Sequence, residues 1–237
     1  MKFYRFIDWK NKVIELAEGD INCALVRNSL SAIKEKWNII DAGAGVGFYT
    51  INMAIKVKKG RVFAFECHPD TMKVLQKNLE LHNLKNVTTI QKALTDKYGE
   101  KTHLWETSSY TGTFVRRDKS GILRAYLGKY KRKLLRQKET RHAGFVETET
   151  IDNFRNNRRL KIHMIKMDIQ GMEEKALLKG SYETLTTDKP MLLIEVHSPT
   201  NKKHFLEVLR QLGYSLTTEL ESTDLPAPLV VKGENKQ

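Results

Sequence analysis

An apolar run in the first quarter of the chain ends in an acid that is followed by three glycines at alternate positions. The stretch reads IIDAGAGVGFYT and contains Asp41, Gly43, Gly45 and Gly47. Glycines let the backbone turn sharply and let a ligand approach without a Cβ in the way. A dinucleotide fingerprint needs a glycine where this chain has Phe48, and the Gly-Lys-Ser/Thr of a P-loop does not follow. The turn therefore favours a ligand that is not held by a pyrophosphate.

A second acid, Glu66, ends the next apolar run, 25 residues after Asp41. In nucleotide-binding folds an acid at this place accepts hydrogen bonds from both hydroxyls of a ribose. A glycine turn and a ribose-binding acid, without a phosphate-binding motif, suit a nucleoside that carries a cationic centre. S-adenosylmethionine is such a molecule. The alternative is a tight turn beside two solvated acids.

Two more acids stand at the ends of apolar runs in the second half of the chain. Asp168 follows HMIKM, and Glu195 ends MLLIE. His197 comes two residues after Glu195 and would lie on the same side of an extended chain. Because buried carboxylates need partners, acids at the ends of three core strands indicate a shared crevice rather than a purely structural sheet.

Short apolar runs alternate with amphipathic segments, which predicts β-α units on a mostly parallel sheet. Ligands of such sheets bind beyond the carboxyl ends of the strands, where the acids and glycines described above would lie. Strands are expected at 38–42, 61–66, 87–91, 163–168 and 191–196, with late strands near 214–219 and 228–232. Helices are expected near 22–36, 68–83, 171–180 and 201–213.

The net charge of +13 is concentrated in one segment. Between Arg116 and His142 there are 11 Lys and Arg against Asp118 and Glu139, which leaves a local excess of +9. Leu123, Leu127, Tyr130 and Leu134 recur there at helical spacing, so an amphipathic basic helix is predicted within a basic insertion or lid at about 110–145. An excess of one sign favours a polyanionic partner.

The hydrophobic content of 40% fits a soluble globular protein, and we predict one domain over 1–237 with a helical lead-in at 1–37. The opening stretch lacks the apolar core of a signal peptide, and the apolar runs are too short to span a bilayer, so a cytoplasmic location is expected. Cys23 and Cys67 show neither disulfide nor metal spacing and are expected to be reduced thiols.

Several blocks of the sequence resemble one enzyme family. The order IDAGAGVGFYT, VFAFECHPDTMKVLQKNLELHN, KALTD, TIDNF, IKMDIQGMEEKALLKG and MLLIEVH is similar to that of the FkbM-type methyltransferases, over about residues 38–200 apart from the basic segment. The resemblance implies an α/β, Rossmann-like fold with a seven-stranded, mostly parallel sheet and helices on both faces. This is the class I fold of methyltransferases that use S-adenosyl-L-methionine. Two positions depart from the family pattern, which usually has Asn at Gly45 and an acid at Gln170.

The resemblance also implies a role for individual residues. The methionine part of the cofactor would be held by Asp41 and the glycine turn, the ribose by Glu66, and the adenine by the residues around His68 and Lys92. The expected cofactor-binding residues are Asp41, Gly43, Ala44, Gly45, Gly47, Tyr49, Thr50, Glu66, Cys67, His68, Lys92, Ala93 and Asp168. The reaction side would be lined by Asp168, Glu173 and Glu195.

Methyl transfer to an alcohol needs an aligned acceptor and a base, because a neutral hydroxyl is a poor nucleophile. His197 is the candidate base, with Asp168 or Glu195 orienting it or binding acceptor hydroxyls. A helix-capping role is the alternative for His197. Asp168 and Glu195 alternatively hold a divalent ion such as Mg²⁺, but the sequence gives no full ligand set and we assign no metal.

The expected reaction is O-methylation of a sugar hydroxyl on a glycan, a lipid-linked sugar or a small-molecule glycoside. The basic segment 116–141 would act as a lid over an acidic or phosphorylated acceptor, or would contact an anionic membrane surface. RNA methylation through this segment is one alternative. A non-catalytic role, as a cofactor-binding or basic scaffold protein, is the other.

Overall fold

The computed structural model describes residues 6–7, 13–14, 24–107, 113–116, 140–195, 202–219 and 228–233. Its centre is a seven-stranded sheet in the order β12-β13-β11-β10-β3-β4-β5. The five strands from β11 to β5 are parallel, and β13 and β12 pair antiparallel at one edge. The strands are β3 Asn38–Ala42, β4 Arg61–Phe65, β5 Val87–Ile90, β10 Met164–Met167, β11 Met191–Glu195, β12 Tyr214–Glu219 and β13 Pro228–Gly233. The predicted mostly parallel α/β sheet is confirmed.

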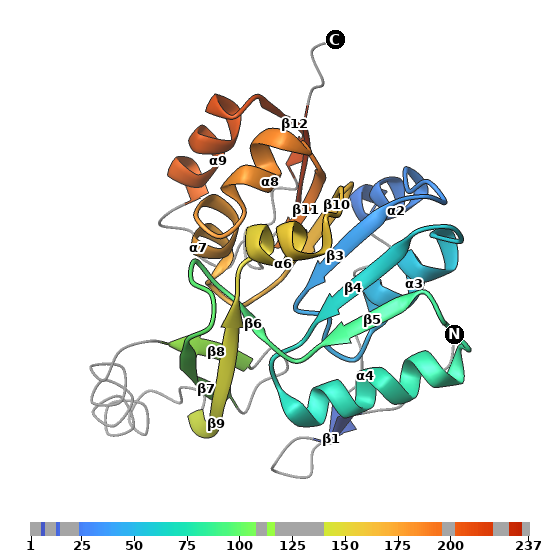
Figure 1. Cartoon of the computed structure of the whole chain (residues 1–237), viewed down its shortest axis with the longest axis vertical. Coiled ribbons are helices and arrows are strands. Elements are labelled where there is room, and N and C mark those ends of the chain that lie inside the picture. The colour runs from blue at the N-terminus through green and yellow to red at the C-terminus, as the bar shows by residue number, and fades with distance from the viewer. Residues whose placement is uncertain are drawn as a thin grey trace.

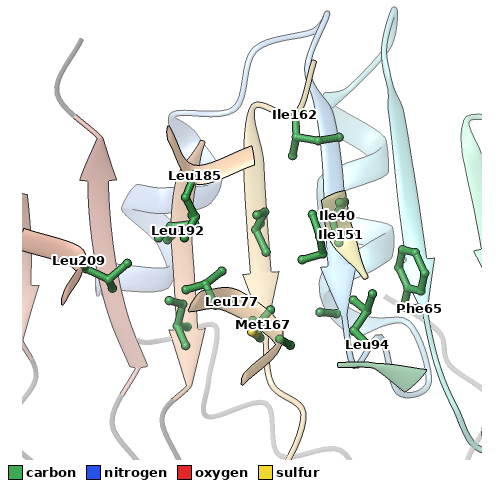
Figure 2. Packing of buried hydrophobic residues seen from close by; sticks show 14 of the residues in the cluster. Ile40, Phe65, Leu94, Ile151, Ile162, Met167, Leu177, Leu185, Leu192 and Leu209 are labelled. Carbon is green, nitrogen blue, oxygen red and sulfur yellow. The ribbon is translucent and has the colours of Figure 1, made fainter. Parts of the chain in front are cut away.

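Helices cover both faces of this sheet, as the family resemblance implied (Figure 1). On one face, Leu30 of α2 and Met53 of α3 pack against the sheet, and Leu75 of α4 packs beside them. On the other face, α6 to α9 contribute a larger apolar cluster, part of which Figure 2 shows. The helices are α2 Ala24–Ser31, α3 Phe48–Lys56, α4 Pro69–Leu81, α6 Ile151–Arg158, α7 Glu173–Leu178, α8 Tyr182–Thr187 and α9 Lys202–Gln211.

Strand alternation decides which face each polar residue of the central strands occupies. Ile40 of β3 belongs to the cluster under α6 to α9, whereas Ile39 packs with α2 and α3. Because successive side chains of a strand point to opposite faces, Asp41 lies on the same face as Ile39. The register pairs Asp41 of β3 with Lys166 of β10, so both polar residues lie side by side within the apolar sheet.

A second sheet of four strands interrupts the β-α alternation between β5 and α6. Its strands are β6 Ala93–Leu94, β7 Lys101–Thr107, β8 Thr113–Arg116 and β9 Thr140–Glu149, in the order β6-β9-β7-β8. Figure 1 shows this added sheet on the side toward which β3, β4 and β5 point. It therefore lies at the edge where ligands of open α/β sheets bind.

The predicted basic helix, with its apolar repeat between Leu123 and Leu134, lies outside the described residues, and the strands β8 and β9 stand at the two ends of the insertion expected at about 110–145. The main partner of β9 is β7, which lies far away in the sequence, so local periodicity does not reveal the pairing. Residues 117–139, which carry most of the basic charge, lie outside the described residues. In the lead-in at 1–37, β1 Phe6–Ile7 and β2 Val13–Ile14 form an antiparallel pair.

Candidate active site

The turn after β3 is a point where three strands come together. The N–H groups of Gly43 and Ala44 donate to the carbonyl oxygen of Phe65, at 3.0 and 2.9 Å. Gly43 has a φ of 77°, and a Cβ there would lie 1.9 Å from the carbonyl oxygen of Asp168. A side chain at this position is therefore excluded, and Gly43 allows the ends of β3, β4 and β10 to approach one another.

The next two glycines of the turn meet different surroundings. Gly47 precedes α3 with a φ of 100°, and a Cβ there would lie 2.7 Å from Leu75 Cδ1. Gly45 has a φ of 55°, and a Cβ there would meet no atom within 4 Å. The turn thus presents bare backbone to open space at Gly45, which fits a ligand that approaches the main chain closely.

Glu66 is a buried carboxylate that the backbone holds in place. Its Oε2 accepts a hydrogen bond from the N–H of Gly45 at 2.9 Å, and its Oε1 accepts one from the N–H of His68 at 2.8 Å. Burial raises the pKa of Glu66, and the two N–H donors oppose that rise. Because a carboxylate oxygen can accept more than one hydrogen bond, Glu66 keeps acceptor capacity for the hydroxyls of a ribose.

Asp41 is fully buried one residue before β3 ends. Its Oδ2 accepts a hydrogen bond of 2.6 Å from the hydroxyl of Thr50. Within the described part of the chain its Oδ1 makes no hydrogen bond, although Lys166 Nζ lies 3.5 Å away. A buried acceptor without a hydrogen bond is unfavourable, and the nearby positive charge of Lys166 offsets that cost.

Lys166 is the residue of this region to which the sequence analysis gave no role. Its side chain is buried, and its Nζ donates to the carbonyl oxygen of Gly43 at 3.0 Å. The same ammonium lies 4.8 Å from the centre of the Tyr49 ring, within the range of a cation–π contact. Lys166 therefore connects the glycine turn, Asp41 and the first turn of α3.

Electrostatics keep the ammonium of Lys166 charged. Burial alone would lower its pKa, but the nearby carboxylates of Asp41, Asp168 and Glu195 outweigh burial and raise the pKa. One signal in the sequence pointed to this residue. A lysine inside the apolar strand HMIKMD, two positions before an acid, is unusual for a strand that is buried on both faces.

Asp168 and Glu195 stand at adjacent strand ends, as predicted. Met167 pairs with Ile194 in the sheet register. Asp168, directly after β10, and Glu195, the last residue of β11, therefore stand at the same level. The side-chain amide of Gln170 donates to Asp168 Oδ1 at 3.1 Å. The proposed base His197 lies outside the described residues, and its placement beside these acids stays a prediction.

Glu173, which was expected to line the reaction side, is buried against its own loop. Its carboxylate accepts hydrogen bonds from the N–H of Gly171 at 2.9 Å and of Ile169 at 3.1 Å. These contacts hold the loop between β10 and α7, and that loop carries Gln170 in a left-handed conformation with a φ of 55°. Glu173 thus stabilises the loop that directly follows Asp168.

The residues expected around the adenine come together where the two sheets meet. Cys67 packs against a small apolar cluster that contains Ala93 and Leu104, and burial raises the pKa of its thiol well above the ordinary value. Lys92 Nζ lies 3.5 Å from Glu149 Oε2 of β9 and 5.6 Å from the centre of the Tyr98 ring. Lys92 thus forms an ion pair with the added sheet.

A family model described as the methyltransferase FkbM domain matches residues 41–216. The chain belongs to the FkbM family of methyltransferases. The match starts at Asp41 and includes the glycine turn, Glu66, Asp168 and Glu195. The resemblance seen in the sequence is confirmed, and this FkbM-family chain is a methyltransferase.

One curated relative, Methyltransferase 1 of Beauveria bassiana (strain ARSEF 2860), is 40% identical over 53 residues. These residues make up 22% of this chain and 21% of the relative, so the chain matches about a fifth of that protein.

Solved structures show the same fold at low identity. A ribosomal protein L11 methylase from Lactobacillus delbrueckii subsp. bulgaricus has a TM-score of 0.52 at 10% identity, over 98% of this chain and 91% of its own. A precorrin-6y C5,15-methyltransferase from Geobacter metallireducens GS-15 has a TM-score of 0.50 at 13% identity, over 95% of both chains. An rRNA methylase from Streptococcus thermophilus has a TM-score of 0.50 at 14% identity, over 86% of this chain and 92% of its own. These likenesses show the class I methyltransferase fold.

Among the described residues, no group of three or more His, Cys, Asp or Glu is arranged to hold a metal ion. No helix in the described part of the chain is long and apolar enough to cross a membrane.

Proposed function

We propose that this methyltransferase uses S-adenosylmethionine to methylate a hydroxyl group of a sugar on a glycan, a lipid-linked sugar or a small-molecule glycoside. The observation that carries the cofactor assignment is the pair of backbone N–H groups, from Gly45 and His68, that fix Glu66 beside the open space at Gly45. A preoriented acceptor next to bare backbone suits the ribose of a nucleoside.

The cofactor is assigned to the edge formed by β3 and β4. Asp41 and the glycine turn would hold the methionine part of the cofactor. Glu66 would take the ribose hydroxyls, and Cys67, His68 and Ala93 would border the adenine. The bound cofactor supplies a methyl group that its positive sulfur already activates.

The protein must align the acceptor oxygen and remove its proton. Asp168 and Glu195, at adjacent strand ends, would accept hydrogen bonds from sugar hydroxyls and so orient the acceptor. His197 would take the proton of the acceptor hydroxyl as that oxygen becomes methylated. Lys166 keeps its positive charge beside these carboxylates.

The first experiment is a calorimetric titration of the protein with S-adenosylmethionine and S-adenosylhomocysteine, with NAD as a negative control. Glu66→Ala is expected to abolish most of the affinity for both ligands. The matched control is Glu80→Ala, an exposed glutamate of α4, which should bind like the wild type. An acceptor screen with sugars, lipid-linked sugars and RNA follows. Unchanged binding by Glu66→Ala would contradict the ribose assignment.

The excess of positive charge between Arg116 and His142 favours RNA as a second candidate acceptor. An RNA methyltransferase predicts RNA binding that weakens steeply with salt and is lost when 116–141 is removed. The alternative is a cytoplasmic sugar methyltransferase, with this segment over an acidic acceptor or on an anionic membrane. It predicts neither salt-dependent RNA binding nor a loss of RNA binding when 116–141 is removed. Cofactor binding without turnover on the whole panel would favour a non-catalytic role.

A further inference from the structure

Glu106 is a buried carboxylate that the added sheet directs toward the main sheet. It belongs to β7, and its neighbour on the same face, Leu104, packs against Ala93 and Val146. Its Oε1 is bonded to Nε2 of His68. Its Oε2 accepts from Arg141 of β9 through Nε at 3.0 Å and through Nη2 at 2.8 Å.

The hydrogen bonds of His68 assign the position of its proton. Nδ1 accepts from the N–H of Asp70 at 3.3 Å and from that of Thr71 at 3.5 Å, and so caps the start of α4. An accepting Nδ1 carries no proton, so the ring proton is on Nε2 and is donated to Glu106. Both nitrogens of the ring are therefore held, one by α4 and the other by β7.

This ring is joined through its own backbone to the cofactor-binding acid. The N–H of His68 donates to Glu66 Oε1, and the other oxygen of Glu66 is bonded to Gly45. When the ring is fixed at both nitrogens, the residue has little freedom to turn, and its N–H stays directed at Glu66. A continuous chain of hydrogen bonds thus runs from Arg141 through Glu106 and His68 to Glu66.

We propose that Glu106 is a positioning residue of the cofactor site, which acts through His68 to fix the orientation of Glu66 for the ribose hydroxyls. The inference rests on the proposed function, because it assumes that Glu66 binds the cofactor ribose. By this chain, the added sheet completes the cofactor site of the main sheet.

The chemistry of the position supports this role over simple packing. Leu104, the neighbour of Glu106 on this face of β7, belongs to an apolar cluster with Val146 and Ala93, and a leucine at 106 would continue that face. Well-packed apolar residues commonly replace a buried ion pair without loss of stability. A carboxylate here provides what a leucine cannot, namely an acceptor for the Nε2 proton of His68.

The test measures S-adenosylhomocysteine affinity by calorimetry for the wild type, Glu106→Leu and Glu106→Gln. Loss of the acceptor in Glu106→Leu is expected to weaken binding about tenfold or more, the effect of losing a hydrogen bond to a charged group. Glu106→Gln keeps an acceptor oxygen for His68 and is expected to stay within about threefold of the wild type. The matched control is Glu100→Leu, an exposed glutamate just before β7.

A double-mutant cycle with Glu66→Gln separates positioning from general damage. If Glu106 acts through Glu66, adding Glu106→Leu to Glu66→Gln causes little further loss, whereas independent effects would add. Melting curves verify that each variant is folded. If Glu106→Leu does not fold, Arg141→Met, whose side chain is half exposed, takes its place and is expected to weaken binding severalfold.

The outcomes distinguish this inference from the proposed function. No binding of S-adenosylhomocysteine by the wild type would overturn both. Wild-type binding that is equal in Glu106→Leu and Glu100→Leu, or losses that simply add in the cycle, would overturn the positioning role and leave the cofactor assignment intact.

Discussion

The carboxyl edge of the main sheet and the added sheet of β6 to β9 fix their buried acids by different means. At the edge, Glu66 is held by backbone N–H groups of Gly45 and His68, which any sequence that makes the turn supplies. In the added sheet, Glu106 is held by the side chains of His68 and Arg141. The edge should therefore be most sensitive to changes that alter backbone geometry, and the added sheet to changes of particular side chains.

The two regions also differ in how completely they are covered. The central strands of the main sheet are packed by helices on both faces. The added sheet buries Leu104 on one face, but its other face carries the rings of His103, His142 and Phe145 in mutual contact, with Phe145 63% exposed. Substitutions should thus have uniformly large effects in the main sheet and face-dependent effects in the added sheet.

The largest effect is expected for Gly43→Ala, which tests the backbone geometry of the edge. The new Cβ would lie 1.9 Å from the carbonyl oxygen of Asp168, and the φ of 77° is itself unfavourable for alanine. We expect a loss of about 3 kcal/mol or more in the free energy of unfolding, measured by urea denaturation. Gly45→Ala is the control, since open space surrounds it, and should lose about 1 kcal/mol from its left-handed backbone alone. Equal losses would contradict the packing described for Gly43.

Lys166→Met should come next, because it leaves the buried carboxylate of Asp41 without its cation. Removing one partner of a buried ion pair typically costs about 3–5 kcal/mol, and we expect a loss near the lower value in urea unfolding at neutral pH. Lys175→Met, on the exposed side of α7, is the control. A loss no greater than that of the control would show that the charge of Lys166 is not needed to support the edge.

Leu104→Ala tests the buried face of the added sheet. Leu104 is 1% exposed, so truncation should remove about 2–4 kcal/mol from the free energy of unfolding. The same measurement on Leu81→Ala, an exposed leucine at the end of α4, should show a much smaller loss. If the two losses are alike, the added sheet does not pack on the main sheet as described.

A pH dependence of cofactor binding should follow from Glu66. Its pKa is raised above 4.5, chiefly by burial, so the carboxylate gains its proton at a higher pH than an ordinary glutamate. Affinity for S-adenosylhomocysteine should fall as pH is lowered through that raised pKa, by up to about tenfold per pH unit. Calorimetry at a series of pH values below neutral measures this fall, and Glu66→Gln should lack it.

The raised pKa of Glu66 also makes the stability of the cofactor-free protein depend on pH. Because the folded state binds the proton of Glu66 more tightly than the unfolded state, Glu66 contributes stability below its unfolded pKa of 4.5. That contribution is lost as pH rises through the raised folded pKa. Cofactor affinity and the contribution of Glu66 to stability should therefore change in opposite directions over this pH range.

The smallest effect on stability is expected for Phe145→Ser, on the open face of the added sheet. Its side chain is exposed, so the free energy of unfolding should change by no more than about 0.5 kcal/mol in thermal or urea unfolding. A loss as large as that of Leu104→Ala would show that this face is covered, and would remove the difference between the two faces.

Most of the main sheet followed from local patterns in the sequence. The runs at 38–42, 61–66, 87–91 and 191–196 became β3, β4, β5 and β11 within one residue at each end. Pro69 and the acid after it started α4, and Asn83, with a φ of 51°, follows its end as expected. These signals are readable because the residues that create them are close together in the chain.

The glycine turn, the strand-end acids and the family could be predicted from the amino-acid sequence, because each depends on residue types at short, fixed spacings. The contact of Lys166 with Asp41 and that of Glu106 with His68 depend on how the chain folds. Both contacts join residues that lie far apart in the chain, and nothing in the local sequence around either residue specifies its partner. Lys166 and Glu106 acquire their roles only in the folded chain. There the ammonium of Lys166 lies beside the buried carboxylate of Asp41, and the carboxylate of Glu106 lies beside the buried ring of His68.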